Sequence, residues 1–388
     1  MGNDPTRKGK GSARIKRIMA INIASQMGGA ELSLLEIVSN ADRERYEFTV
    51  VMPPGGDLPC AMAKMARVVV LPVLNFSRAR SFRKLLKLFC GFIPVSLRLA
   101  RLALETHTDI IYANSTKAGV YGMVVKLFTG RKLIWHIRDN LESRFLAWLL
   151  GFYSDKIICN SYFTDGQLRS FASKRTVLHS FVSGKSLAGI DTLFDLRGEL
   201  HLPARTMLLA VAGRLIPQKN HADAILAFSR LAGSVADVHL LIIGGDVSGE
   251  YPGYINYLKK LVKDHGLEYR VSFTGYQPRP LDYLAQINVL VNASIREPFG
   301  RTVLEATLLG KPVVAYNSGG PAEIVVNGLS GYLVDPKEGH MGLACGMERL
   351  IGDRDLLNRM SRFTKDYGRK AFDGRATMEK LEELFSVI

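Results

Sequence analysis

The chain has 388 residues, of which 47% are hydrophobic and 22% are charged, a composition typical of a globular protein with room for two domains. It contains no run of 18 uncharged apolar residues and begins with a charged stretch, so it predicts neither a transmembrane helix nor a signal peptide. Cys60, Cys90, Cys159 and Cys345 include no Cys-x-x-Cys pair. This spacing favours a reducing cytoplasm and argues against a zinc site or a disulfide framework.

The net charge of +15 is concentrated in the first half of the chain. Residues 1–183 hold 27 Lys and Arg against 13 Asp and Glu, and residues 58–104 hold nine basic side chains and no acidic one. Apolar residues recur at helical spacing from Phe82 to Ile93, with basic residues on the other faces. We therefore expect residues 78–104 to contact an anionic membrane surface. A core-packed helix with a solvated basic face is the alternative, and no nucleic-acid-binding motif is present.

Apolar periodicity predicts two successive series of alternating strands and helices. After a disordered tail over residues 1–13, the first series has strands at 18–24, 48–52, 68–73, 110–113, 132–136 and 156–159, and helices at 30–40, 118–128 and 140–151. The second series has strands at 207–212, 239–243, 271–274, 289–292 and 312–316. Two such series indicate an α/β protein with two doubly wound parallel sheets. We expect a first domain over 14–183, a linker over 184–204 and a second domain over 205–369.

The most informative stretch, residues 292–321, reads as strand, loop, helix and strand. Glu297 lies in the loop, and Glu305 lies one turn inside the helix. Loops at the carboxyl ends of parallel strands bind ligands, and a helix that starts there directs unpaired N–H groups at an anion. The two carboxylates are therefore candidates for holding both ends of a nucleotide sugar. Thr302 and Glu305 also match a capping box, in which Glu305 would only satisfy the helix end.

A second turn, after the strand at 207–212, supplies positive charge. Arg214 and Lys219 flank the start of a helix predicted over 221–231, for which Asn220 is a good N-cap. Two cations beside a helix start are suited to a diphosphate, although two solvated surface cations would give the same sequence. Gly28 and Gly29, before another helix, either form a tight turn or let the backbone approach a ligand closely.

Polar residues at two further strand ends are also candidate site residues. Asn114 follows one strand and Arg138 and Asp139 follow another, and these three are candidates for an acceptor site, whereas His136 closes the second of these strands. A strand-end histidine such as His136 is more often structural than functional. No Gly-x-Gly-x-x-Gly fingerprint is present, which argues against a nicotinamide enzyme. No Asp-x-Asp pair stands at a strand end, so we expect no metal ion.

Taken together, these motifs carry a family resemblance. Glu297-Pro-Phe-Gly with Glu305, then Gly-Lys-Pro-Val-Val-Ala and Ser-Gly-Gly, resembles the donor-site signature of retaining glycosyltransferases of family 4, the group 1 glycosyl transferases, which have the GT-B fold. The likeness extends to residues 28–31, His136, residues 213–220 and residues 327–334. One departure is visible, because the family usually reads Gly-Gly-x-Pro-Glu where this chain has Gly-Gly-Pro-Ala-Glu at 319–323. The role of Glu323 is therefore left open.

The resemblance implies two Rossmann-like domains that face each other across a cleft, with a last helix at about 370–388 that packs back on the first domain. It implies that Glu305 binds the ribose, that Arg214 and Lys219 bind the diphosphate, and that Glu297 binds the sugar hydroxyls. His136 would lie beside the transferred sugar and contact a hydroxyl, without acting as the general base. The other residues implied in donor binding are Gly28, Gly29, Gly213, Phe299, Gly300, Arg301, Thr302 and Val303.

The function that we expect is that of a retaining, metal-independent glycosyltransferase without a cofactor, which uses a nucleoside-diphosphate sugar as donor. Retention would proceed by a front-face reaction, and Glu297 as a covalent nucleophile is the alternative. The basic first half suggests a lipid-linked or membrane-surface saccharide as acceptor, in cell-surface polysaccharide or glycolipid assembly. We expect a cytoplasmic protein, with peripheral attachment to the inner face of the membrane as a further expectation. A nucleotide-sugar 2-epimerase of similar fold and a non-catalytic sugar-nucleotide-binding protein are the competing hypotheses.

Overall fold

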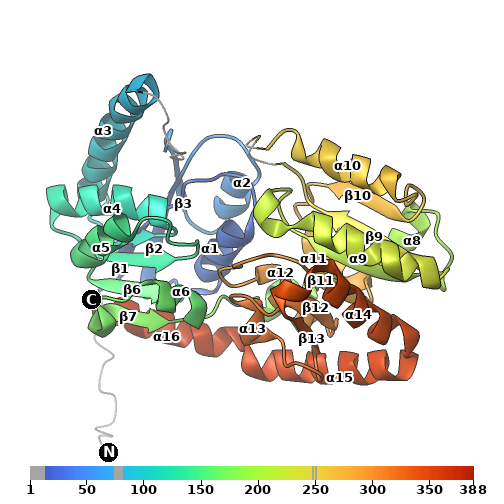
Figure 1. Cartoon of the computed structure of the whole chain (residues 1–388). Coiled ribbons are helices and arrows are strands. Elements are labelled where there is room, and N and C mark those ends of the chain that lie inside the picture. The colour runs from blue at the N-terminus through green and yellow to red at the C-terminus, as the bar shows by residue number, and fades with distance from the viewer. Residues whose placement is uncertain (1–13, 74–81, 247–248, 250) are drawn as a thin grey trace, which may run out of the picture.

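The structure, a computed structural model, describes residues 14–73, 82–246, 249 and 251–388, with the backbone alone for residues 82–90. The tail expected over residues 1–13 and the first residues of the basic segment, 78–81, lie outside the described residues. Two α/β domains stand side by side and are joined along their lower edge (Figure 1). The expected fold class, two doubly wound parallel sheets, is confirmed.

The first domain contains a seven-stranded sheet in the order β3-β2-β1-β4-β5-β6-β7. All six neighbouring pairs of strands are parallel. The strands are β1 (Lys16–Ile21), β2 (Tyr46–Met52), β3 (Arg67–Val70), β4 (Ile110–Ala113), β5 (Lys132–Ile137), β6 (Lys156–Cys159) and β7 (Arg175–Val177). The helices are α1 (Gly29–Asn40), α2 (Leu58–Met62), α3 (Phe82–Glu105), α4 (Thr116–Thr129), α5 (Arg144–Tyr153) and α6 (Tyr162–Gln167).

Alternating side chains on the strands build a core on each face of this sheet. On β1, Ile18 and Ala20 belong to the cluster formed with α1 and α2. Met19 and Ile21, which point to the opposite face, belong to the cluster formed with α3 and α4. Both faces are therefore buried, which is the arrangement that a continuous apolar strand requires.

The second domain contains a six-stranded parallel sheet in the order β10-β9-β8-β11-β12-β13. The strands are β8 (Met207–Ala212), β9 (Val238–Ile243), β10 (Val271–Gly275), β11 (Val289–Asn292), β12 (Val313–Tyr316) and β13 (Gly331–Val334). The helices are α7 (Gly184–Ala188), α8 (Leu196–Glu199), α9 (His221–Ser234), α10 (Tyr254–Asp264), α11 (Pro280–Gln286), α12 (Arg301–Leu308), α13 (Pro321–Ile324), α14 (Gly339–Gly352) and α15 (Arg354–Ala371). The sequence had predicted neither β7 nor β13, both of which are short edge strands.

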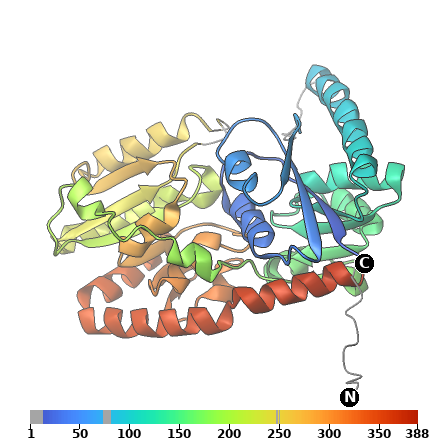
Figure 2. The ribbon, with the colours of Figure 1, turned by 180° about the vertical axis from the view of Figure 1, so that it is seen from behind.

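The chain crosses between the domains twice. Phe181 packs in the core of the first domain and Val182 in that of the second. The return crossing joins α15 to α16 (Gly374–Ser386), which runs beneath the first domain (Figure 2). Phe385 of α16 packs in the core of the first domain, where its ring lies 5.5 Å from that of Tyr46. A Cβ on Gly374 would lie 2.8 Å from the Phe181 ring, so the two crossings touch.

Candidate functional site

The loop after β11 places Glu297 against a Gly-Gly turn from the loop after β12. The backbone N–H of Gly320 donates to the Glu297 carbonyl at 2.8 Å. A Cβ on Gly319 would lie 2.1 Å from that carbonyl oxygen, and one on Gly320 would lie 2.2 Å from Phe299 Cα. No side chain fits in either place. The Ser-Gly-Gly motif thus holds the Glu297 loop by the backbone contacts of its glycines and by the Ser318 hydroxyl, which accepts from the Arg296 N–H at 3.1 Å.

The carboxylate of Glu297 meets Lys219, which the sequence had placed on a separate turn. Lys219 Nζ lies 2.5 Å from Glu297 Oε2, with the two side chains 24% and 9% exposed. Burial alone would raise the pKa of Glu297, but the charge and hydrogen bond of Lys219, a hydrogen bond from Ser294 and the charge of Arg214 leave it below 4.5. Glu297 is therefore a carboxylate held by positive charge.

The start of α12 differs from the capping box that the sequence allowed. Gly300 occupies the N-cap position with φ of 91°, and no side chain caps the helix. Glu305 instead accepts a hydrogen bond from Arg301 Nε at 2.8 Å, so the capping-box interpretation is wrong. Among the described residues, no hydrogen bond uses the backbone N–H groups of 301–303. The first turn of α12 therefore keeps its donors for an anion.

The start of α1, in the first domain, lies against α12. A Cβ on Gly29 would lie 3.6 Å from Arg301 Cβ, and one on Gly28 would lie 2.8 Å from Glu31 Oε2. Glu31 is buried and accepts from Asn22 at 3.4 Å. Burial raises its pKa, opposed by its own backbone N–H, Asn22, Arg214 and Arg138. Glu31 lies within residues 28–31, to which the family resemblance extends, but it was not predicted as a site residue; its place in the first helical turn after two glycines was the available signal.

The positive charge of Arg214 acts on both Glu297 and Glu31. Its side chain is exposed, and its charge lowers the pKa of both Glu297 in the second domain and Glu31 in the first. Gly213, beside it, has φ of 150°, and a Cβ there would lie 3.6 Å from Lys219 Cε. The turn after β8 therefore brings both predicted cations to the carboxyl ends of the strands, between the two domains.

The predicted acceptor-side residues form a buried polar chain. Arg138 Nε donates to Asn114 Oδ1 at 2.7 Å, and Arg138 Nη1 donates to Ser180 Oγ at 3.1 Å. Asn114 Nδ2 donates in turn to Asn22 at 2.9 Å, which connects this chain to Glu31. Burial lowers the pKa of Arg138. Arg138 and Asn114 therefore reach the first turn of α1.

His136, which the resemblance places beside the transferred sugar, is buried in the first domain. Its ring is 2% exposed, and its Nδ1 faces the Tyr112 hydroxyl and, at 3.3 Å, Arg138 Nη2. Burial and the charge of Arg138 hold its pKa well below 6.5. Within the described part of the chain, no hydrogen bond or ion pair joins it to Glu297, Lys219 or Arg214. The structure therefore places a neutral His136 behind Arg138.

Asp139 and Asn220 also act locally. Asp139 Oδ1 accepts from Thr116 Oγ1 at 2.6 Å, at the start of α4. Asn220 occupies the predicted N-cap position of α9, but it has left-handed backbone angles and its side chain makes no capping bond. The Tyr254 hydroxyl accepts from the backbone N–H groups at the start of α9. Positive charge near Glu297 thus comes from side chains rather than from an open α9 end.

Glu323, whose role the sequence left open, ties the domains together. Its carboxylate accepts from the backbone N–H groups of Tyr162 and Phe163 at 2.9 and 2.7 Å. His179 Nε2 lies 3.0 Å from the same carboxylate. Glu323 of the second domain thus caps α6 of the first, beside the Glu297 loop.

Two features are absent from the described residues. These residues include no group of three or more His, Cys, Asp and Glu side chains that could hold a metal ion. No helix among them is long and apolar enough to cross a membrane.

Two parallel-sheet domains, with cations, carboxylates and two helix starts gathered at their facing edges, define a protein of the GT-B class. Family models agree with this, since residues 27–183 match Glycosyltransferase Family 4 and residues 195–367 match Glycosyl transferases group 1. The chain belongs to the group 1 glycosyltransferases, as the resemblance predicted.

Individual relatives extend over nearly the whole chain. The lipopolysaccharide core biosynthesis glycosyltransferase LpsE of Rhizobium meliloti is 24% identical over 369 residues, which cover 92% of this chain and 94% of that protein. The crystal structure of Anabaena HepE with UDP and glucose has a TM-score of 0.81 at 24% identity and covers 97% of this chain and 100% of that one. The lipopolysaccharide outer core galactosyltransferase WaaB has a TM-score of 0.64 at 20% identity, with 96% and 100% covered. At these identities the two structures establish the fold alone.

Proposed function

We propose that the protein is a retaining, metal-independent glycosyltransferase that moves a sugar from a nucleoside-diphosphate sugar to a saccharide acceptor in lipopolysaccharide or cell-surface polysaccharide assembly. The observation that carries this proposal is the Lys219–Glu297 pair at 2.5 Å, together with the charge of Arg214. Relatives support it, since LpsE is named for lipopolysaccharide core biosynthesis and HepE was crystallised with UDP and glucose.

In this proposal the diphosphate lies between the turn after β8 and the start of α12. Arg214 and Lys219 supply positive charge, and the N–H groups of 301–303 donate hydrogen bonds. These groups stabilise the negative charge that develops on the leaving phosphate, the task that a divalent cation performs in other transferases. Glu297 accepts from the sugar hydroxyls, and Glu305 accepts from the ribose diol.

Retention of configuration follows from the chemistry of the leaving group. The leaving phosphate accepts the proton of the attacking hydroxyl on the same face of the sugar, through an oxocarbenium-like state. Glu297, which Lys219 already holds, serves better as a hydrogen-bond acceptor than as a nucleophile. Arg138 and Asn114, which reach the first turn of α1, line the acceptor side.

Thermal-shift screening against nucleoside diphosphates and their sugars tests the donor. A ligand at about 100 times its dissociation constant stabilises the fold by about 2.7 kcal/mol. We expect at least one nucleoside diphosphate to raise the melting temperature with EDTA present. A stabilisation that requires a divalent cation would refute metal independence, and the absence of any shift would refute the donor site.

The acceptor is proposed to lie at an anionic membrane surface. On α3, which stands at the outer end of the first domain (Figure 1), Ile93, Leu97 and Leu104 are each about half exposed, and Arg98 and Arg101 are exposed beside them. On α5, Phe145 and Trp148 are 72% and 47% exposed. Aromatic and apolar side chains flanked by cations are suited to a lipid interface.

Flotation with liposomes tests this surface. We expect the protein to float with vesicles that contain anionic lipid and to remain in solution with neutral vesicles. Replacement of Phe145 and Trp148 by Ser should weaken the flotation, whereas replacement of Tyr269, an exposed aromatic residue of the second domain, should not. Equal recovery with and without anionic lipid would favour a soluble acceptor.

A further inference from the structure

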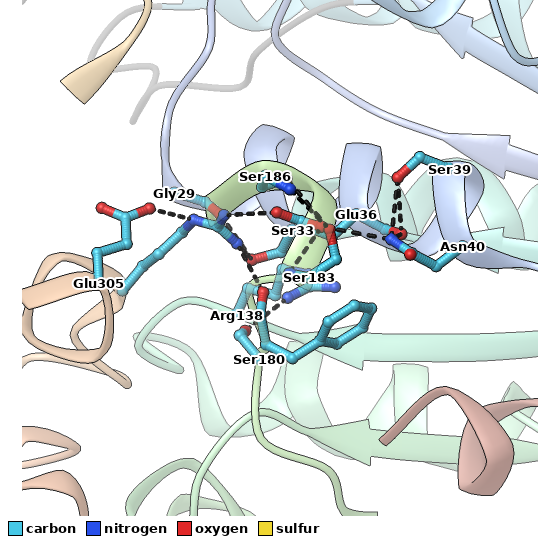
Figure 3. Close-up of polar contacts among 12 residues, drawn as sticks. Gly29, Ser33, Glu36, Ser39, Asn40, Arg138, Ser180, Ser183, Ser186 and Glu305 are labelled. Atoms are coloured by element: carbon cyan, nitrogen blue, oxygen red, sulfur yellow. Dashed lines mark hydrogen bonds and ion pairs between the residues drawn. The ribbon is translucent and has the colours of Figure 1, made fainter. Parts of the chain in front are cut away.

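Arg301, the first residue of α12, binds four groups on three segments of the chain. Nε donates to Glu305 at 2.8 Å, and Nη1 donates to Ser33 Oγ at 3.1 Å and to the Phe181 carbonyl at 3.3 Å. Nη2 lies 3.6 Å from Glu36 Oε1. Ser33 and Glu36 belong to α1 of the first domain and Glu305 to the second (Figure 3). One guanidinium thus spans the two domains.

Glu36 continues the connection to the crossing between the domains. Its second oxygen, Oε2, accepts from the backbone N–H of Ser183 at 3.1 Å and from Asn40 Nδ2 at 3.4 Å. Ser183 directly follows the point where the chain passes from the first core to the second. Glu36 therefore joins α1, the crossing and Arg301. It has no part in the donor or acceptor binding proposed above.

Burial gives this network a fixed geometry. The side chains of Arg301, Glu36 and Glu305 are 8%, 5% and 2% exposed, so one cation lies between two carboxylates with little water. A buried charge that loses its partner carries a large desolvation cost, and the planar guanidinium offers its donors in fixed directions. Each carboxylate is therefore held in the orientation that Arg301 allows.

We propose that Arg301 and Glu36 are positioning residues, which fix the carboxylate of Glu305 for the donor only while the two domains keep this arrangement. The proposal rests on the function proposed above, in which Glu305 binds the ribose diol. Three of the four partners of Arg301 are Ser33, Glu36 and the Phe181 carbonyl, none of which lies in the second domain. When the domains separate, Arg301 loses these three and holds Glu305 by one contact.

The consequence is a coupling between donor affinity and domain arrangement. Donor binding that needs an oriented Glu305 favours the closed arrangement, and by reciprocity the closed arrangement favours donor binding. Separation of the domains loosens Glu305 and thereby promotes release of the nucleoside diphosphate. Neither Arg301 nor Glu36 needs to touch the reacting atoms for this effect.

The test combines binding with a measurement of shape. Glu36→Gln removes one charge at nearly constant volume, and Arg301→Lys keeps the charge but loses the planar fork. Affinities for UDP and for GDP are measured by calorimetry, and the radius of gyration is measured by small-angle scattering with and without each nucleotide. Asp165→Asn is the matched control, because it breaks a partly buried ion pair, Asp165 with Arg175 at 3.1 Å, that lies wholly within the first domain.

We expect both variants to bind the preferred nucleotide about two- to thirtyfold more weakly and to have a larger radius of gyration that saturating nucleotide reduces. In the double variant the loss of binding free energy should be smaller than the sum of the losses in the two single variants, since both substitutions break the same network. The control variant should have a lower melting temperature but the same nucleotide affinity and the same radius of gyration as the wild type.

The outcomes separate this inference from the proposed function. If Glu305→Gln weakens nucleotide binding but Glu36→Gln and Arg301→Lys lower only the melting temperature, the network is merely structural and the inference is wrong. If Glu305→Gln binds UDP and GDP as the wild type does, the proposed donor site itself fails. A wild type that binds no nucleoside diphosphate would overturn both.

Discussion

Replacement of Lys219 by Met is the sharpest test of the charge arrangement around Glu297. The methionine keeps the stem that packs on Gly213, where a Cβ would lie 3.6 Å from Lys219 Cε, and removes only the ammonium group. If Lys219 stabilises the departing diphosphate, its loss costs about 2.7–4 kcal/mol in the transition state, or about 10²–10³ in kcat. Steady-state release of the nucleoside diphosphate, measured with the donor found by thermal screening, gives kcat directly.

The same substitution affects stability less than catalysis. It leaves the Glu297 carboxylate, which is 9% exposed, without its nearest partner, and an unsatisfied buried acceptor costs about 1–3 kcal/mol. The matched control is Lys259→Met on the exposed side of α10, which should change kcat by less than about twofold because surface charges have small effects. A Lys219→Met enzyme within tenfold of wild-type kcat, with the expected loss of melting temperature, would show that the pair is structural and refute the reasoning.

Three further predictions concern the Gly-Gly turn and two buried ionisable groups. Gly320→Ala should destabilise the fold by about 1–3 kcal/mol and reduce kcat, because its Cβ would lie 2.2 Å from Phe299 Cα. The control, Gly233→Ala on α9, should be neutral or stabilising, because its Cβ would have no atom within 4 Å. Equal melting temperatures for the two variants would contradict this. Burial and Arg270 lower the pKa of His239 to about 4, so between about pH 6.5 and 4 the unfolded chain binds a proton at this histidine that the folded chain does not bind. His239→Asn should therefore reduce the loss of unfolding free energy between pH 7 and 5 by about 2 kcal/mol. Urea unfolding at the two pH values checks this, and equal losses in variant and wild type would disprove it. Burial raises the pKa of Glu31, so the folded state disfavours the ionised form of this carboxyl at neutral pH. Glu31→Gln should therefore raise the melting temperature at pH 7, by an amount that vanishes as the pH falls towards 4.5. A difference in melting temperature between variant and wild type that stays constant from pH 7 to 4.5 would contradict the argument.

Much of the fold could be predicted because buried parallel strands are continuous apolar runs. The predicted bounds of β4, β6, β8 and β11 agree with the structure residue for residue. The edge strands β7 and β13 escaped prediction, since β7 (Arg175–Val177) has only three residues, all half-buried, and β13 (Gly331–Val334) begins with a glycine and is half-buried at its two central residues, so neither gives a clear apolar run. Sheet order could be expected in outline from the family resemblance but not from periodicity.

The candidate site was predictable where a motif and a strand end coincide. The sequence placed Glu297 and Lys219 at the carboxyl ends of separate strands, and the structure brings them to 2.5 Å. It could not show that Arg301 would direct its side chain to Glu36, since those residues belong to different domains and their contact depends on how the domains pack. The burial of His136 could not be read from the sequence either, although strand alternation puts it two residues before Arg138 on the same face.

The return of the chain through α16 has a consequence for the order in which the protein folds. The core around β1, β2 and β4 is completed by Met378, Leu381 and Phe385 of α16, which follows the second domain in the chain. Domains usually fold as units during synthesis, the N-terminal one first. Here the apolar face that α16 covers stays exposed until the second domain and α16 have been synthesised, so the first domain cannot complete its core before the second domain has been made.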